Sequence, residues 1–333
     1  MKAIAARNLS KTYWYHQKEA GLSGSIRALL RAKKVLVEAV REINLDVELG
    51  EVLGFVGPNG AGKTTTLKML SGILHPTSGV VEVMGFVPCK REKDFLKSIS
   101  FVMGQRSRLF WDLPAEEYFN FCKVVYEIPD SVFRRNRRHL IELAEIGDIL
   151  KVPQRKLSFG QRKRCELAAA LLHDPAVIFL DEPTNALDLL NARKVREFIK
   201  EKGTEGKHTI VLTSHILSDI EQTCGRIVII NEGRIAYDGR IRDLIRMDGF
   251  KKQIRVVFGG DWSRSHLDGL GTVKEIQGQE VLLEVNPAET QGIISYLAAL
   301  GTVKDINIID QPLEQVVEAL YVKGRGEQDL AGE

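Results

Sequence analysis

The fold is decided by one stretch of the sequence, Gly57-Pro58-Asn59-Gly60-Ala61-Gly62-Lys63-Thr64-Thr65. It matches the phosphate-loop pattern, in which a glycine is followed by four residues and then by Gly-Lys-Ser/Thr. The apolar run at 51–56 predicts a buried strand before it, and the apolar spacing over 64–74 predicts a helix after it. A glycine-rich turn can match part of the pattern by chance, but the order of strand, loop and helix favours nucleotide binding.

The residue types of this loop suit the phosphates of a nucleotide. Glycines let backbone N–H groups turn inward toward an anion, and the following helix adds the positive end of its dipole. Lys63 is then placed to reach the outer phosphates, and the Thr64 hydroxyl to bind Mg²⁺. The loop by itself does not say what the nucleotide is used for.

Composition places the chain among ordinary globular proteins. It has 333 residues, of which 44% are hydrophobic and 27% charged, and this length predicts one large domain and a smaller one. The net charge of +3 is too small to indicate nucleic-acid binding. The four cysteines have no metal-type spacing, so reduced thiols are expected. With no signal-peptide core and no membrane-spanning apolar run in the sequence, we expect a soluble, cytoplasmic chain whose membrane role would come through a partner.

Predicted strands and helices alternate through the middle of the chain. Strands buried on both faces are predicted from continuous apolar runs at 99–104, 176–180, 209–213 and 226–231. Helices are predicted between them, at 113–126, 130–149, 161–172 and 192–202. This alternation predicts an α/β fold with a doubly wound, mainly parallel sheet.

The ends of the chain differ from this middle part. A change in composition after 247–249 predicts a nucleotide-binding domain at 1–248 and a small α+β domain at 249–323, with a flexible tail at 324–333. An insertion at 15–34 contains a basic amphipathic stretch, which fits a membrane or partner surface. The alternative for this insertion is a solvated surface segment.

Further polar residues follow predicted strands or precede a predicted helix. Asp181 and Glu182 end the apolar run at 177–182; a carboxylate there can hold Mg²⁺, and the next can activate a water as general base. His215 follows another strand, where its imidazole could bond a γ-phosphate. Gln105 also lies just past a strand, and Ser158 precedes a helix, which makes a second possible anion site. Taken singly, His215 and Gln105 fit ordinary loop residues equally well.

With these motifs in this order, the sequence resembles the ATP-binding cassette (ABC) ATPases. The phosphate loop is similar to their Walker A motif, 177–183 (VIFLDEP) to Walker B, and 157–161 (LSFGQ) to the signature LSGGQ. Gln105 resembles the Q-loop glutamine, 186–188 the D-loop, and His215 the switch histidine. Phe159 departs from the family's usual glycine. The resemblance covers 1–246 and is best to cassettes of exporter-type systems with a separate permease.

The resemblance implies the roles of the site residues. The fold would add to the mainly parallel sheet an antiparallel β part and a helical subdomain at about 106–172. ATP would be held by residues 57–65, with Tyr13 stacking on adenine (Trp14 and Tyr15 are alternatives). Thr64, Gln105 and Asp181 would hold Mg²⁺. Glu182 would act as general base, while Lys63 and His215 contact the γ-phosphate. Ser158, Gly160 and Gln161 would contact ATP bound to a second copy of the same or a related cassette.

The resemblance also implies a partner and a place in the cell. ATP hydrolysis would drive transport through a polytopic membrane permease met by residues 106–119, with the chain peripheral on the inner face of the cell membrane. No nucleic acid is expected. One alternative is a soluble ABC-type ATPase acting on ribosomes or DNA, which the single Walker A loop and the lack of a long coiled coil disfavour. The other is a nucleotide-sensing regulator, which Glu182 and His215 disfavour.

Overall fold

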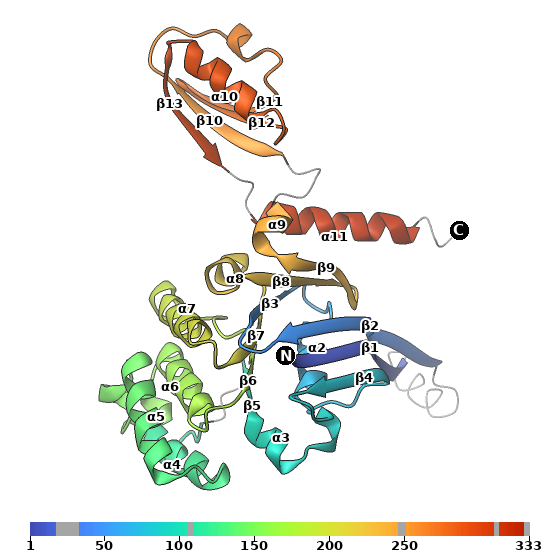
Figure 1. The fold of residues 1–333 in the computed structure, drawn as a ribbon, viewed down its shortest axis with the longest axis vertical. Coiled ribbons are helices and arrows are strands. Elements are labelled where there is room, and N and C mark those ends of the chain that lie inside the picture. Colours follow the sequence, from blue (N-terminus) through green and yellow to red (C-terminus); the bar gives the residue numbers. More distant parts are fainter. Residues whose placement is uncertain (18–32, 105–108, 246–250, 310–312, 330–333) are drawn as a thin grey trace, which may run out of the picture. The chain divides into compact units, whose positions relative to one another are not determined.

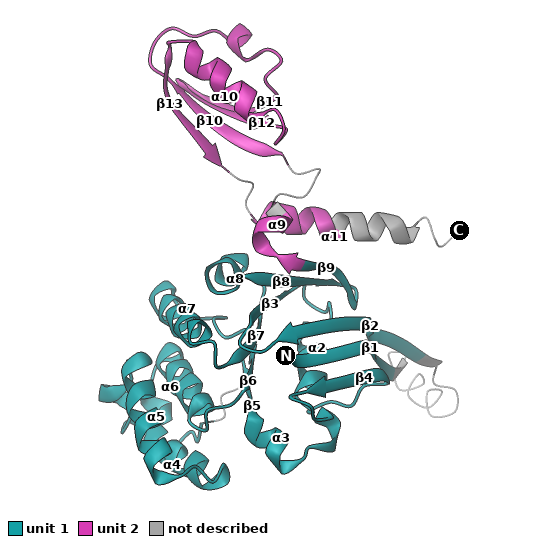
Figure 2. Ribbon diagram, viewed as in Figure 1, with its two compact units in different colours: residues 1–238 teal, residues 239–333 magenta. Residues whose placement is uncertain are grey.

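The structure is a computed structural model that describes residues 1–17, 33–104, 109–245, 251–309 and 313–329 (Figure 1). Two compact units divide the chain, Met1–Asp238 and Gly239–Glu333 (Figure 2). Most of the basic insertion predicted at 15–34 lies outside the described residues, as does Gln105. In the described ranges, no helix combines the length and the apolar character that a bilayer crossing requires.

A sheet of six strands forms the centre of the first unit, in the order β5-β6-β7-β3-β8-β9. The strands from β5 to β8 pair in parallel, as predicted from their apolar runs. In β7 every residue is buried, as expected of a strand covered on both faces. The strands are β3 (Val52–Val56), β5 (Ile99–Met103), β6 (Val177–Asp181), β7 (Thr209–Ser214), β8 (Arg226–Asn231) and β9 (Arg234–Arg240).

Helices lie on both sides of this sheet. In Figure 1 α2 lies on one side, and α6, α7 and α8 lie on the other. Because the parallel strands run in one direction, their carboxyl ends meet at one edge, where β3 leads into the phosphate loop and β6 into Glu182. The helices are α2 (Lys63–Leu70), α3 (Lys93–Ser98), α6 (Phe159–Leu171), α7 (Leu189–Thr204) and α8 (Leu217–Thr223).

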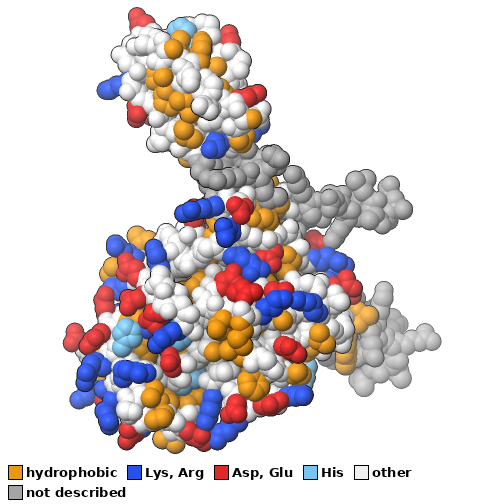
Figure 3. Space-filling model, viewed as in Figure 1, with side chains coloured by type: hydrophobic (Ala, Val, Ile, Leu, Met, Phe, Trp, Pro, Cys, Tyr) orange, Lys and Arg blue, Asp and Glu red, His pale blue; other side chains and the backbone are white. Residues whose placement is uncertain are grey.

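A second, antiparallel sheet packs against the same core. Its order is β2-β1-β4, made by β1 (Lys2–Gln17), β2 (Lys33–Glu48) and β4 (Ser78–Val83). Apolar side chains of both sheets share one buried cluster, which includes Ile4, Leu45 and Phe55. On the face drawn in Figure 3, acidic and basic side chains of this unit are interspersed.

Three helices form a separate helical part of the first unit. These are α4 (Ala115–Val125), α5 (Asp130–Leu143) and α6, and both α4 and α5 contact α6. Helix α5 ends earlier than the predicted 149, since Glu145 adopts a left-handed φ of 50° and a 3₁₀ turn follows at Gly147–Ile149. This part holds the signature-like residues at the start of α6.

The second unit has its own four-stranded antiparallel sheet, in the order β11-β12-β10-β13. Ile254, Val256 and Leu283 belong to its own buried cluster. The unit begins before the boundary predicted at 248, because α9 (Ile241–Ile245) contacts α11 (Leu313–Asp329). Its other elements are β10 (Lys252–Phe258), β11 (Thr272–Gln277), β12 (Glu280–Val285), α10 (Thr290–Ala299) and β13 (Val303–Ile309).

Candidate active site

The phosphate loop turns between β3 and α2 in a way that needs glycine at two positions. A Cβ on Gly57 would lie 2.4 Å from the Ile230 carbonyl oxygen. Gly62 has a φ of 107°, and a Cβ there would lie 2.4 Å from the Ala39 carbonyl oxygen. The core therefore holds the loop closely from behind, with α2 beginning at Lys63.

Lys63 is the buried cation of this loop. Its Nζ donates to the carbonyl oxygens of Gly57 at 2.7 Å and Pro58 at 3.1 Å. Burial lowers the pKa of Lys63 from its ordinary value, and the negative charges of Glu182 and Asp181 oppose this shift. The ammonium is thus hydrogen-bonded to the loop backbone, and the two nearby carboxylates favour its charged form.

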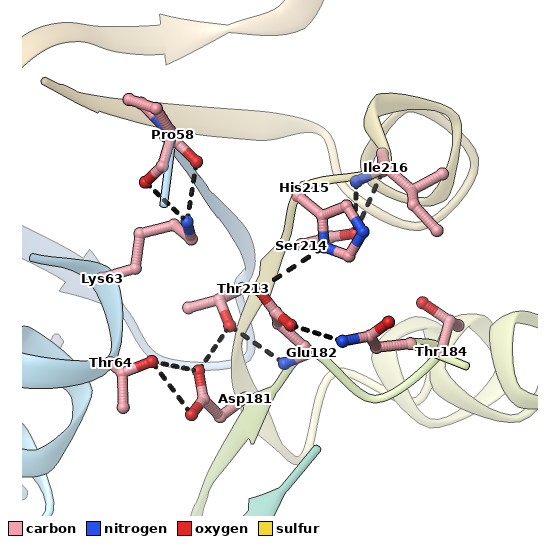
Figure 4. A network of polar contacts seen from close by, with 12 residues as sticks. Pro58, Lys63, Thr64, Asp181, Glu182, Thr184, Thr213, Ser214, His215 and Ile216 are labelled. Atoms are coloured by element: carbon pink, nitrogen blue, oxygen red, sulfur yellow. Dashed lines mark hydrogen bonds and ion pairs between the residues drawn. The ribbon is translucent and has the colours of Figure 1, made fainter. Parts of the chain in front are cut away.

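Asp181, at the end of β6, is bonded to hydroxyls from two neighbouring elements. Thr64 Oγ1 donates to its Oδ1 at 2.9 Å and lies 3.1 Å from its Oδ2, and Thr213 Oγ1 donates to Oδ1 at 2.8 Å (Figure 4). A carboxylate beside a hydroxyl offers the oxygen ligands that Mg²⁺ prefers. The residues present therefore fit a magnesium ion between Thr64 and Asp181.

Glu182 is hydrogen-bonded through its backbone to β7, and the side chains of Asn185 and His215 orient its carboxylate. Its backbone N–H donates to the Thr213 carbonyl oxygen at 3.1 Å and the Thr213 hydroxyl at 3.0 Å, and its φ is 50°. Asn185 Nδ2 donates to Glu182 Oε2 at 2.8 Å, and His215 Nδ1 lies 3.5 Å from Oε1. The carboxylate is thereby oriented from both oxygens (Figure 4).

Thr64 and the two carboxylates, with Asn185 and His215, line one cavity of about 550 Å³. The phosphate loop and α2, the ends of β5 and β6, and the turn after β7 all contribute to its wall. Such a cavity lies at the carboxyl edge of the sheet, where α/β folds bind ligands. Its lining residues are Asn59, Thr64, Lys68, Met103, Gly104, Asp181, Glu182, Asn185 and His215.

The signature-like residues Ser158, Gly160 and Gln161 lie at the start of α6, outside the cavity wall. The Ser158 hydroxyl accepts from Gln161 N at 3.2 Å, and Gln161 Oε1 accepts from Ser158 N at 2.9 Å, which forms a capping box for α6. Gly160 lies against Asn191 at the start of α7, where a Cβ would come within 2.5 Å of Asn191 Cγ. In the described structure, none of these three residues lines the cavity.

Tyr13 and Gln105 are the remaining predicted residues, and of these two the structure describes only Tyr13, which is not part of the cavity wall. Tyr13 lies on β1 opposite Val37, with 41% of its surface exposed and the Lys11 ammonium 5.4 Å from its ring centre. Gln105 lies outside the described residues, although Gly104 before it lines the cavity.

Sequence reasoning missed three residues of the site. Thr213 bridges Asp181 and Glu182, Asn185 orients Glu182, and Lys68 lines the cavity from α2. Thr213 has a usable signal, because it lies one residue before the end of a buried strand and two positions before His215. For Lys68 the signal is its place one helical turn after Thr64, on the same face of α2.

The sequence is similar to those of known transport proteins. The sequence profile of a family described as ABC transporter matches residues 40–185. The ABC transporter ATP-binding protein NatA of Bacillus subtilis is 34% identical over 212 residues, which cover 64% of this chain and 86% of NatA. The chain belongs to the ABC transporter ATP-binding family. The bacitracin transport ATP-binding protein BcrA of Bacillus licheniformis is 34% identical, with 66% of this chain and 68% of BcrA covered.

Solved structures agree with this assignment at the level of the fold. An ATP-binding cassette solved as a dimer in a post-hydrolysis state, bound to ADP and Pi, superimposes with a TM-score of 0.58 at 24% identity. The match covers 71% of this chain and 98% of that cassette. As an ABC cassette, the chain is the ATP-binding subunit of a transporter and an ATPase. The predicted P-loop cassette fold and ATPase activity are thereby confirmed.

Proposed function

We propose that this ATPase works as a dimer that drives export through a separate membrane permease. One observation supports the hydrolytic step most directly: Glu182 follows Asp181 at the end of β6, beside the cavity that the Thr64 end of the phosphate loop also lines. A γ-phosphate in the reach of Lys63 would then lie between the loop and the Glu182 carboxylate. In this proposal the Glu182 carboxylate would lie next to the water that attacks the γ-phosphate.

In this proposal each cavity residue has a separate task. Residues 57–65 bind the phosphates, and Lys63 exchanges its carbonyl contacts for phosphate oxygens. Glu182 takes a proton from the attacking water, while Asn185 and His215 hold its carboxylate in place. Thr64 and Asp181, with Gln105 as predicted, would hold Mg²⁺. The ion, when bound, would offset negative charge on the phosphate oxygens.

A dimer is supported because the chain has two possible phosphate-binding sites, the phosphate loop and the N-terminus of α6, and they do not line the same cavity. Ser158 lies at the N-terminus of α6, a helix of 13 residues whose first turn contains no acidic residue. In the described part of the chain Ser158 does not line the cavity, so an anion bound at this helix N-terminus would not be the ATP bound by the same chain. A second copy, the same or related, would bring ATP to this helix.

A permease partner is supported by an exposed aromatic cluster on the helical part, which we call the α4 cluster: Phe110, Tyr118 and Phe121. The ring centres of Phe110 and Tyr118 lie 5.3 Å apart, and those of Phe110 and Phe121 lie 5.4 Å apart. Phe110 and Phe121 stay 40% and 47% exposed. Half-exposed aromatic groups are typical of protein interfaces, and this cluster overlaps the stretch 106–119. The chain would then sit on the inner face of the membrane.

We propose export as the direction of transport because the motifs resemble those of exporter-type cassettes with a separate permease. BcrA is named for bacitracin transport, and this chain matches it over most of the BcrA sequence. We propose that this chain likewise drives transport, and that the permease determines which compound is transported.

Replacing Glu182 with Gln tests the hydrolytic role. The amide keeps the Asn185 contact in part but cannot take a proton, so turnover should fall by about 100-fold or more while ATP binding is kept. ATP hydrolysis and equilibrium binding of labelled ATP measure the two effects, and a trapped ATP-bound dimer is expected on size-exclusion chromatography. Glu197→Gln, an exposed carboxylate on α7, is the matched control. Turnover close to that of the unchanged protein would refute the role of Glu182.

A further inference from the structure

The helix that begins with the signature-like residues also holds a buried cation. Lys163, on α6, has a side chain that is only 2% exposed. Its Nζ donates to the Met103 carbonyl oxygen at 2.5 Å, to Glu166 Oε2 at 3.1 Å and to the Gly104 carbonyl oxygen at 3.4 Å. A buried ammonium is tolerated only when it is paired and hydrogen-bonded, and these three acceptors match its three donors.

The two carbonyl groups belong to the edge of the ATP cavity. Met103 ends β5 and pairs with Asp181 of β6, and both Met103 and Gly104 line the cavity. A Cβ on Gly104 would lie 2.7 Å from the Asp181 carbonyl oxygen, so the chain passes β6 with no room to spare. Strand β5 is at the edge of the sheet and ends at Met103, and Lys163 supplies a donor to the carbonyls of Met103 and Gly104 from α6.

We infer that Lys163 is a positioning residue, which fixes the β5 edge of the cavity against Asp181 and ties it to α6. The same rigid helix carries Ser158 at its first turn and Lys163 in its interior. A displacement of α6 therefore moves the anchor of Met103 and Gly104. This inference rests on the proposed function, in which Asp181 and Glu182 perform hydrolysis at this edge.

The competing explanation is that Lys163 and Glu166 only neutralise each other in the core. Glu166 is 4% exposed, and removal of one partner alone would leave a buried charge. Replacing both partners with methionine removes the charges together and keeps similar volume. If neutralisation were the whole role, that double variant would retain turnover.

The experiment compares Lys163→Met/Glu166→Met with a matched pair, Lys202→Met/Glu205→Met. Lys202, near the end of α7, is also buried, with a side chain 5% exposed, and it pairs at the same three-residue spacing with Glu205, which directly follows the helix; neither residue lines the cavity. For each protein, kcat, KM for ATP and the melting temperature are measured. We expect the Lys163 pair variant to keep its fold and its KM, because Lys163 does not contact the phosphate loop, but to lose about tenfold or more in kcat. The control pair should keep kcat.

Wild-type kcat in the folded Lys163 pair variant would overturn the inference. Should that variant not fold, Lys163→Arg decides, because it keeps the charge pair with Glu166 while its planar guanidinium does not reproduce the contacts of the ammonium with both carbonyls. Its kcat should fall by about tenfold at an unchanged KM, and the kcat of the unchanged protein would overturn the inference. Near-normal ATP turnover in Glu182→Gln would instead refute the proposed function. Failure of the proposed function and failure of the inference about Lys163 are therefore seen in different variants.

Discussion

The Thr213 hydroxyl joins both carboxylates of the site, and Thr213→Val removes it with little change in shape. The side chain is fully buried, and its hydroxyl donates to the charged Asp181 and accepts from the Glu182 backbone N–H. Hydrogen bonds to charged groups contribute about 1.5–3 kcal/mol, and Glu182 N keeps the Thr213 carbonyl as acceptor. We therefore expect the free energy of unfolding to fall by about 1.5–3 kcal/mol.

Thr209→Val, on the same strand, is the matched control for the loss of stability expected in Thr213→Val. Thr209 is also fully buried on β7, but its hydroxyl accepts from the uncharged Gly50 N–H at 3.0 Å, so Thr209→Val should cost about 0.5–1.5 kcal/mol. For a unit of this size about 1 kcal/mol lowers the melting temperature by about 2–4 °C, so Thr213→Val should lower it by about 3–12 °C. Thermal denaturation and ATP hydrolysis measure stability and turnover, and only Thr213→Val should reduce turnover strongly. Equal melting temperatures and equal turnover in the two variants would refute the bridging role of this hydroxyl.

Three further predictions concern the dimer, the pH dependence and the permease. Mixing the inactive variants Lys63→Ala and Ser158→Arg should restore part of the ATPase activity, since a mixed dimer contains one site with both groups intact; no rescue in mixed dimers shown to form would favour a site within one chain or strict coupling of both sites. Burial lowers the pKa of His173 to about 4, so between its ordinary pKa of about 6.5 and 4 the unfolded chain takes up a proton that the folded chain does not. The free energy of unfolding should therefore fall as the pH falls from about 6.5 to about 4, and it should fall less in His173→Gln. Urea denaturation at several pH values measures this, and the same pH dependence in both proteins would contradict it. Phe121→Asp in the α4 cluster should weaken co-purification with the permease and leave basal ATPase activity intact; unchanged co-purification would place the permease contact elsewhere.

Much of the site was predictable because its chemistry is local in sequence. The phosphate loop, and the carboxylates that end β6, follow from short patterns whose geometry is set by the adjoining strand and helix. Buried parallel strands were predictable for the same reason, since apolar runs such as that in β7 have few alternatives. By contrast, β9 was missed because it is half-exposed along its whole length and lacks an apolar run.

Residues whose polar contacts depend on the tertiary fold or on an unusual turn could not be predicted. In sequence Lys163 resembles a solvated lysine, because Arg162, Arg164 and Glu166 are its charged neighbours, and its acceptor Met103 lies 60 positions away. Asn185 orients Glu182 through a contact that depends on the turn after β6, where Glu182 has a φ of 50°. Neither helical periodicity nor composition contains this information, because both describe the burial of a face and not the partner of a single polar group.

The two separate cores have a consequence for calorimetry. One buried cluster contains Phe55 and Phe179 of the first unit, and the other contains Ile254 and Leu283 of the second. Heat unfolding of such a chain is not described by a single two-state transition. A nucleotide that binds only the first unit raises the midpoint of that unit alone. The endotherm of the second unit then serves as an internal reference in every scan, against which ligand binding and site substitutions are read within one sample.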